Sequence, residues 1–235
     1  EEEFKRRINV ALNFSAQNDV LVTLGITPTR PDTGYGYIQF IEDAAEEKRV
    51  KTFTEKPNLE FANQFIASGD YVWNAGIFVW NVNAIIKAFT EFLPEMADAL
   101  QIAQKDFYTE NEKAALDKAY PRCRSISIDN GVMERAENVY VVLSDIGWSD
   151  LGTWKSVYEN SEKDENNNAI DANVMLYDTK DCVIKAPKEK LVVVNGLENF
   201  IVADFDNVLM ICHQDDEQRV KQFVNDAKEK GEEFV

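Results

Sequence analysis

The apolar run at residues 20–26 limits the fold of this 235-residue chain more than any other feature. Its letters, V-L-V-T-L-G-I, do not alternate between polar and apolar residues, which is typical of a strand buried on both faces of a sheet. Residues 4–15 repeat apolar side chains at helical spacing and so predict an amphipathic helix. A helix that leads into a buried strand is half of a β-α-β unit, so we expect an α/β fold.

The run V-K-T-F-T-E-K-P at residues 50–57 predicts a strand that ends in an acid beside a cation. Pro57 cannot donate to a strand ladder and favours an extended Lys56, so Glu55 and Lys56 stand at the strand's carboxyl end. Ligands of α/β sheets bind at such ends, where a carboxylate accepts hydrogen bonds from hydroxyls and an ammonium binds negative charge. The alternative is a solvated strand end without a ligand.

A second strand, predicted at residues 71–80, contains Asn74 and Gly76 within an otherwise apolar run. Asn and Gly weaken a strand interior, and they occur there where the backbone bulges or a ligand comes close. We expect two neighbouring strands to bring Glu55, Lys56 and this pair to one place. A plain β-bulge is the alternative.

Two further positions are candidates for the same place. Gly36 belongs to a G-x-G pair that no helix follows, which argues against a dinucleotide fingerprint. A glycine there would let a main-chain amide touch a ligand, or would only assist a bulge. Asp129 stands where an alternating stretch stops, close to a predicted helix start, so it either caps that helix or contacts a substrate.

A third strand end precedes Asp150. Residues 138–143 predict a buried strand, and a glycine turn leads from it to Asp150 at a predicted helix start. A carboxylate held there could bind a hard cation such as Mg²⁺. This ion takes one or two carboxylates, keeps water ligands and binds phosphate oxygens of a substrate. Alternatively, Ser149 or Asp150 is simply the N-cap of the helix.

Composition excludes several classes of function. A formal net charge of −17 excludes DNA and RNA as partners, because phosphate backbones are bound by basic surfaces. Three scattered cysteines and one histidine form no zinc-ribbon pattern and no disulfide framework, which favours a reducing, cytoplasmic setting. No apolar run approaches the ~18 residues of a membrane span.

The composition changes at residues 162–168, where K-D-E-N-N-N predicts a linker. Short strands with Asn-Gly and Asp-Asn turns follow, and residues 216–230 predict a closing helix. We therefore expect a catalytic-type α/β domain at residues 1–165 and a small β-roll or β-helix-like module at residues 166–235. Nothing in the second module indicates catalysis.

Five motifs, in this order, resemble those of the sugar-nucleotide pyrophosphorylases and most closely the mannose-1-phosphate guanylyltransferases. They are R-P-D-T-G-Y-G-Y-I, F-T-E-K-P, W-N-A-G-I-F-V-W, S-I-D-N-G-V-M-E and G-W-S-D-L-G-T-W. The resemblance covers nearly the whole chain. It implies a Rossmann-like mixed sheet followed by a β-helix-like module, and transfer of GMP from GTP to mannose-1-phosphate, which gives GDP-mannose and pyrophosphate.

The resemblance also implies roles for the candidate residues. Glu55 would accept hydrogen bonds from mannose hydroxyls, and Lys56 would neutralise the sugar phosphate. Asp150 would be one of two carboxylates that hold Mg²⁺. The sugar pocket would be completed by Gly36, Asn74, Gly76 and Asp129.

The chain departs from the family's pattern at its beginning. The Gly-rich loop that embraces the nucleotide triphosphate is absent, and so is the S-D-H segment that supplies the other metal ligand. We therefore expect an N-terminally truncated sheet that carries the sugar-phosphate half of the site and forms no GDP-mannose unaided. An apolar sheet edge would be exposed where the missing strands pair, which predicts self-association, most simply a homodimer. The alternatives are another hexose-1-phosphate or nucleotide, or a non-catalytic sugar-phosphate-binding or assembly module.

Overall fold

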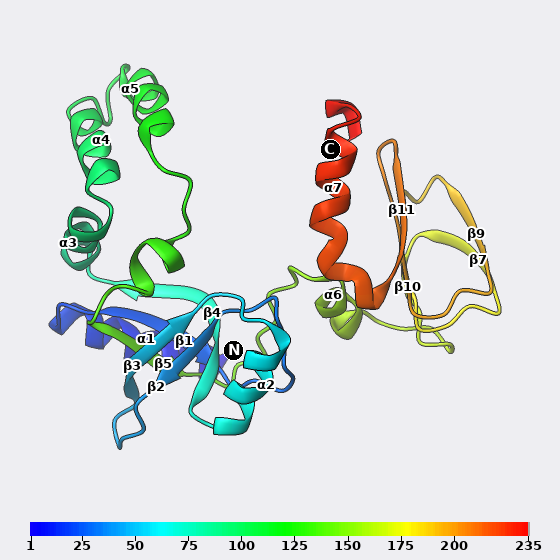
Figure 1. The fold of residues 1–235 in the computed structure, drawn as a ribbon, viewed down its shortest axis with the longest axis horizontal. Coiled ribbons are helices and arrows are strands. Elements are labelled where there is room, and N and C mark those ends of the chain that lie inside the picture. Colours follow the sequence, from blue (N-terminus) through cyan, green and yellow to red (C-terminus); the bar gives the residue numbers. More distant parts are fainter. Residues whose placement is uncertain (235) are drawn as a thin grey trace. The chain divides into compact units, whose positions relative to one another are not determined.

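A computed structural model describes residues 1–234, and the chain divides into two compact units, Glu1–Trp148 and Ser149–Val235 (Figure 1). The division falls before helix α6 (Trp154–Asn160), and thus before the domain boundary expected at 165/166. The boundary at 165/166 stays a prediction, because a compact unit need not begin and end where an evolutionary domain does.

The first unit contains five strands that pair in a closed ring in the order β1-β4-β2-β3-β5. β1 pairs antiparallel with β4 and parallel with β5, so the sheet is mixed, as predicted. β3 closes the ring because its second half pairs with β2 and its first residues pair with β5. The strands are β1 (Leu21–Ile26), β2 (Tyr37–Phe40), β3 (Glu47–Thr54), β4 (Tyr71–Trp80) and β5 (Val139–Leu143).

Ring closure corrects the expectation of a free apolar sheet edge. Within the described part of the first unit, each of the five strands has a hydrogen-bonded neighbour on both sides. A closed sheet offers no row of unpaired main-chain groups to another chain. The homodimer therefore stays a prediction without the edge that motivated it.

Strand β1 is buried along its whole length, as its unbroken apolar run predicts. Leu21 packs in the core on one face of the strand, and Val22 and Leu24 pack in a second core on the other. Each fully buried side chain of this kind contributes about 2 kcal/mol from apolar burial. Helix α1 (Glu2–Gln17) precedes β1 and buries Ala11 and Ser15, which completes the predicted helix–strand pair.

The chain segments between the strands carry the remaining helices of the first unit. Asn58 caps α2 (Leu59–Ser68) by accepting from the amide of Phe61, and Gly69 ends the helix with φ of +79°. Both signals were predicted, and only glycine adopts this left-handed conformation freely. The other helical segments are α3 (Val82–Phe92), α4 (Pro94–Gln104), α5 (Glu112–Ala119), η1 (Tyr120–Arg122) and η2 (Asp129–Met133).

Helices α3, α4 and α5 form an arm that extends away from the sheet (Figure 1). Asn81 caps α3 as predicted, by accepting from the amide of Asn83. Pro94 ends α3 and also begins α4, because proline is well suited to the first turn of a helix. The arm returns the chain to the sheet at residues 124–128, just before η2.

The second unit is a β-helix-like module, as predicted. β6, β8 and β10 pair in parallel, β11 turns back antiparallel on β10, and β7 pairs in parallel with β9. Cys182, Ile184, Val194 and Val202 form its core. The strands are β6 (Ala169–Asp171), β7 (Asn173–Tyr177), β8 (Val183–Lys185), β9 (Leu191–Asn195), β10 (Phe200–Phe205) and β11 (Val208–His213).

Helical segments flank this module in the sequence. α6 precedes it, and η3 (Gln214–Arg219), α7 (Val220–Lys228) and η4 (Glu232–Phe234) follow it, where one closing helix was predicted. None of the helices in residues 1–234 combines the length and the apolar composition needed to cross a bilayer.

Candidate functional site

Glu55 and Lys56 lie at the carboxyl end of β3, as predicted, and their side chains form an ion pair. The Glu55 side chain is only 17% exposed, whereas that of Lys56 is 51% exposed. Pro57 predicted an extended Lys56, but the Lys56 main chain is left-handed, with φ of +47°. This conformation costs a residue with a Cβ about 1–2 kcal/mol, and such strain is concentrated at functional sites.

Strands β3 and β4 are not neighbours, because β2 lies between them. The convergence of their polar residues therefore depends on Gly36, directly before β2. A Cβ atom at Gly36 would lie 2.8 Å from Glu55 Oε2 and 3.4 Å from Asn74 Cβ. The missing side chain thus lets Glu55 and Asn74 approach from the two flanking strands, although the strands themselves do not touch. The register shift of the β2–β3 pair lies at Phe40, not at Gly36.

Asn74 stands at a true β-bulge. Thr23 of β1 pairs with Phe78, and Gly25 pairs with Asn74, so β4 carries extra residues between them. Gly76 lies within the bulge with φ of +68°, which glycine tolerates best. The bulge alternative is thus correct for the backbone.

Both the oxygen and the nitrogen of the Asn74 amide make hydrogen bonds. Its Oδ1 accepts from Thr23 Oγ1 at 3.0 Å and from the amide of Gly76 at 3.1 Å. Its Nδ2 donates to Asp129 Oδ1 at 3.0 Å. Thr23 is completely buried, so its hydrogen bond fixes the Asn74 side chain to the core. Asn74 in turn positions Asp129.

Asp129 is the first residue of the π-helical turn η2, and the N-cap position is Ile128. The carboxylate instead accepts from Asn74, so the capping alternative is wrong. Burial raises the pKa of Asp129, and the nearby charge of Glu55 raises it further. A carboxylate with a raised pKa that faces a second acid and an ammonium is typical of a functional site.

A cavity of about 680 Å³ opens beside Glu55 and Lys56. Its volume lies within the roughly 300–1,000 Å³ that small-molecule sites occupy. Sequence reasoning missed the residues on its other side, although two arginines flanking S-I-S-I-D could have signalled an anion site. These further lining residues are Arg124, Ser125, Ile126, Ser127, Asn130, Glu134 and Arg135.

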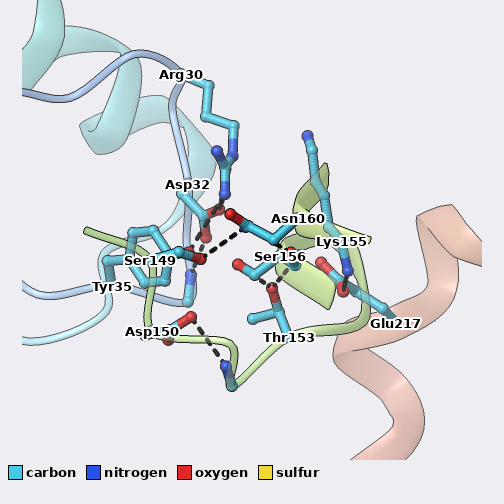
Figure 2. A network of polar contacts seen from close by, with 12 residues as sticks. Arg30, Asp32, Tyr35, Ser149, Asp150, Thr153, Lys155, Ser156, Asn160 and Glu217 are labelled. Carbon is cyan, nitrogen blue, oxygen red and sulfur yellow. Dashed lines mark hydrogen bonds and ion pairs between the residues drawn. The ribbon is translucent and has the colours of Figure 1, made fainter. Parts of the chain in front are cut away.

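Asp150 belongs to the second unit, in a loop ahead of α6. Its Oδ1 accepts from the amide of Gly152 at 3.0 Å (Figure 2). The expected position at a helix start is wrong, because α6 begins at Trp154. Thr153 caps that helix by accepting from the amide of Ser156 at 3.1 Å, so neither Ser149 nor Asp150 is the cap.

The described residues offer few ligands to a metal. No group of three or more His, Cys, Asp or Glu side chains in residues 1–234 could hold a metal ion. Asp150 contributes a single carboxylate, which is compatible with Mg²⁺ only if phosphate oxygens and water supply most of the ligands.

Comparison with known proteins shows to which family this fold and its motifs belong. Residues 4–167 match the profile of the family described as Nucleotidyl transferase, and the chain belongs to that family. Residues 172–226 match the MannoseP isomerase/GMP-like beta-helix domain, in agreement with the parallel strands of the second unit.

Individual relatives confirm the resemblance to mannose-1-phosphate guanylyltransferases. The chain is 37% identical to xanthan biosynthesis protein XanB of Xanthomonas campestris over 98% of its own length and 49% of the relative's. It is 33% identical to a mannose-1-phosphate guanylyltransferase of Escherichia coli, over 94% and 48% of the two chains. A crystal structure of mannose-1-phosphate geranyltransferase from Thermus thermophilus matches with a TM-score of 0.80 at 29% identity, covering 97% of this chain and 65% of that one. The chain thus spans about half the length of these curated relatives.

Proposed function

We propose that this chain provides the sugar-phosphate half of a guanylyltransferase site that converts mannose-1-phosphate and GTP into GDP-mannose and pyrophosphate. The observation that carries the proposal is that Glu55 and Lys56 line one cavity while the Asn74–Asp129 pair lies next to Glu55. Membership of the nucleotidyl transferase family supports the same reaction class.

The polar groups around the cavity suit the two parts of a sugar phosphate. Carboxylates accept hydrogen bonds from vicinal hydroxyls, so Glu55 and Asp129 would bind the hexose. Lys56 would bind the phosphate, and the guanidinium groups of Arg124 and Arg135 line the same cavity. Gly36 and Gly76 would allow the main chain to approach the sugar closely.

In the reaction, an oxygen of the sugar phosphate attacks the α-phosphorus of GTP, and the bond from that phosphorus to the pyrophosphate oxygen breaks. The residues of this chain would hold the attacking phosphate in line and offset its charge, which lowers the barrier mainly through positioning. Mg²⁺, for which Asp150 is the proposed protein ligand, would neutralise charge on the phosphates.

We further propose that these 235 residues do not transfer the nucleotidyl group unaided. The family's Gly-rich triphosphate loop does not occur in them, and they span about half the length of the curated relatives. The other half of the site would then come from residues outside this sequence.

Two assays test the proposal on the purified chain. Calorimetry with mannose-1-phosphate, glucose-1-phosphate, free mannose and inorganic phosphate should show the tightest binding for mannose-1-phosphate. Preference for another hexose-1-phosphate would mean that this other sugar phosphate is the substrate. No binding of any sugar phosphate would overturn the assignment. Release of pyrophosphate from GTP, Mg²⁺ and mannose-1-phosphate should be undetectable, and enzyme-like release would overturn the half-site.

A further inference from the structure

The π-helical turn η2 contacts two strands that do not pair with each other, β4 at its bulge and β3 at its carboxyl end. The turn is closed by an i to i+5 hydrogen bond of 2.9 Å from the amide of Glu134 to the carbonyl of Asp129. At its start, Asp129 accepts from the Asn74 side chain of β4. At its end, Glu134 Oε1 accepts from the amide of Glu55, directly after β3, at 3.1 Å. π-Turns of this kind occur frequently at functional sites.

Glu134 is itself held in position. In the amide orientation that satisfies both of its polar atoms, the Asn130 nitrogen points toward this carboxylate. It then donates to Glu134 Oε2 at 3.1 Å and to Oε1 at 3.3 Å. Both residues line the same cavity as Glu55 and Lys56. The Glu134 carboxylate therefore connects the π-turn to the main chain at the point where Lys56 adopts its left-handed conformation.

We propose that Glu134 is a positioning residue that fixes the Glu55–Lys56 main chain and thereby sets the affinity of the cavity for a sugar phosphate. It acts through the Glu55 amide and not by contact with the ligand, since a second negative charge beside a phosphate would oppose binding. The affinity part of this inference rests on the proposed function. The main-chain part does not.

Two substitutions separate positioning from charge. Glu134→Gln removes the negative charge but keeps an oxygen that can accept from the Glu55 amide. Glu134→Ala removes both. If Glu134 affected the phosphate only by repulsion, both variants would bind mannose-1-phosphate more tightly. If it positions Glu55 and Lys56, only Glu134→Ala weakens binding, by roughly fivefold for the loss of one charge-assisted hydrogen bond at a solvated site.

The experiment combines calorimetry with amide hydrogen exchange on the whole chain. We expect the Glu55 amide to exchange roughly fivefold faster in Glu134→Ala and within about twofold of the parent in Glu134→Gln. Glu137→Ala, at an exposed glutamate of the same segment, is the matched control and should change neither readout.

The outcomes distinguish the two proposals. Unchanged Glu55 exchange in Glu134→Ala overturns the positioning role, whether or not a ligand binds. Parent-like affinity of Glu134→Ala, when the parent binds mannose-1-phosphate, overturns its effect on the site. Failure of the parent chain to bind any sugar phosphate overturns the proposed function and, with it, the affinity part of this inference, while the exchange readout still decides the main-chain part.

Discussion

Two asparagine–aspartate pairs, one in each unit, show what separates a functional network from a structural one. In the second unit, Asn168 is completely buried, donates to Asp164 and to the carbonyl of Thr179, and accepts from the amide of Cys182. All three partners lie within one turn of the module. The pair therefore satisfies main-chain groups that the β-helix would otherwise bury unpaired.

In the first unit, Asn74 connects side chains that are distant in the sequence, Thr23 and Asp129, close to Glu55, which lines an open cavity. The pKa values of the two aspartates, Asp164 and Asp129, are shifted in opposite directions. Burial alone would raise the pKa of Asp164, but hydrogen bonds donated by Asn168 and Asn166 hold it below its usual value. The pKa of Asp129 is raised by burial and by Glu55. One network stabilises the charged form of its carboxylate, and in the other the charged form is disfavoured, as is typical of functional sites.

The largest effect should come from Asn168→Ala. It leaves two buried main-chain groups, the Thr179 carbonyl and the Cys182 amide, without their partner, so we expect the second unit to lose about 3 kcal/mol of stability, measured by urea unfolding. Asn173→Ala, at an exposed position of β7, is the matched control and should change stability by less than about 0.5 kcal/mol. Equal effects of the two substitutions would contradict a structural role for Asn168.

Lys56→Met should leave the fold intact and weaken mannose-1-phosphate binding roughly thirtyfold, because a charge-assisted contact to phosphate contributes about 2 kcal/mol. Calorimetry measures the loss. Lys51→Met removes an exposed lysine from the same strand and should leave the affinity within about twofold. Similar losses in both variants would mean that general charge, and not Lys56, attracts the ligand.

Gly36→Ala tests the meeting point of β2, β3 and β4. The new Cβ would lie 2.8 Å from Glu55 Oε2, and we expect that side chain to move aside. Binding should weaken roughly fivefold, an effect of about 1 kcal/mol, while the melting temperature changes little. Parent-like binding would show that Glu55 need not occupy its observed position.

The smallest effects should have opposite signs. Asp129 has a raised folded pKa, so its stability contribution is fully present below the unfolded value of about 3.9 and is lost as the pH rises through the folded pKa. Asp129→Asn should therefore melt above the parent at pH 7, and the difference should shrink as the pH falls toward about 4. Thermal melts across this range measure it.

Asp164 has a lowered folded pKa, so its contribution is present above about pH 3.9 and is lost as the pH falls through the folded value. Asp164→Asn should melt below the parent at pH 7, with a difference that shrinks below about pH 4. The same sign for both variants would contradict the contrast between the two networks.

Local signals in the sequence predicted local structure well. The unbroken apolar run of β1, the Asn58 cap and the Gly69 terminator each act within a few residues, and all three are confirmed. Glu55 and Asn74 do approach each other at Gly36, but their strands are not the neighbours that were expected, because β2 lies between them. The closed ring depends on β3 pairing with β5, which no local pattern encodes.

The failures have the same physical origin. Asp150 was expected at a helix start, but Ser149, Asp150 and Thr153 are all good capping residues, and only the fold selects Thr153. Arg124 and Arg135 were overlooked because exposed basic residues next to a loop look like solvated surface. Their place beside Lys56 depends on the return of the α3–α5 arm to the sheet.

The most direct test of the sugar-phosphate site is a titration of ¹⁵N-labelled chain with mannose-1-phosphate, followed through the backbone amides. We expect saturable shifts confined to the cavity and its supports, at Gly36, Glu55, Lys56, Gly76 and residues 124–134, with none in the β-helix-like unit. Saturable shifts that leave Glu55 and Lys56 unmoved, or that lie mainly in residues 169–213, would contradict the assignment of this cavity to the sugar phosphate.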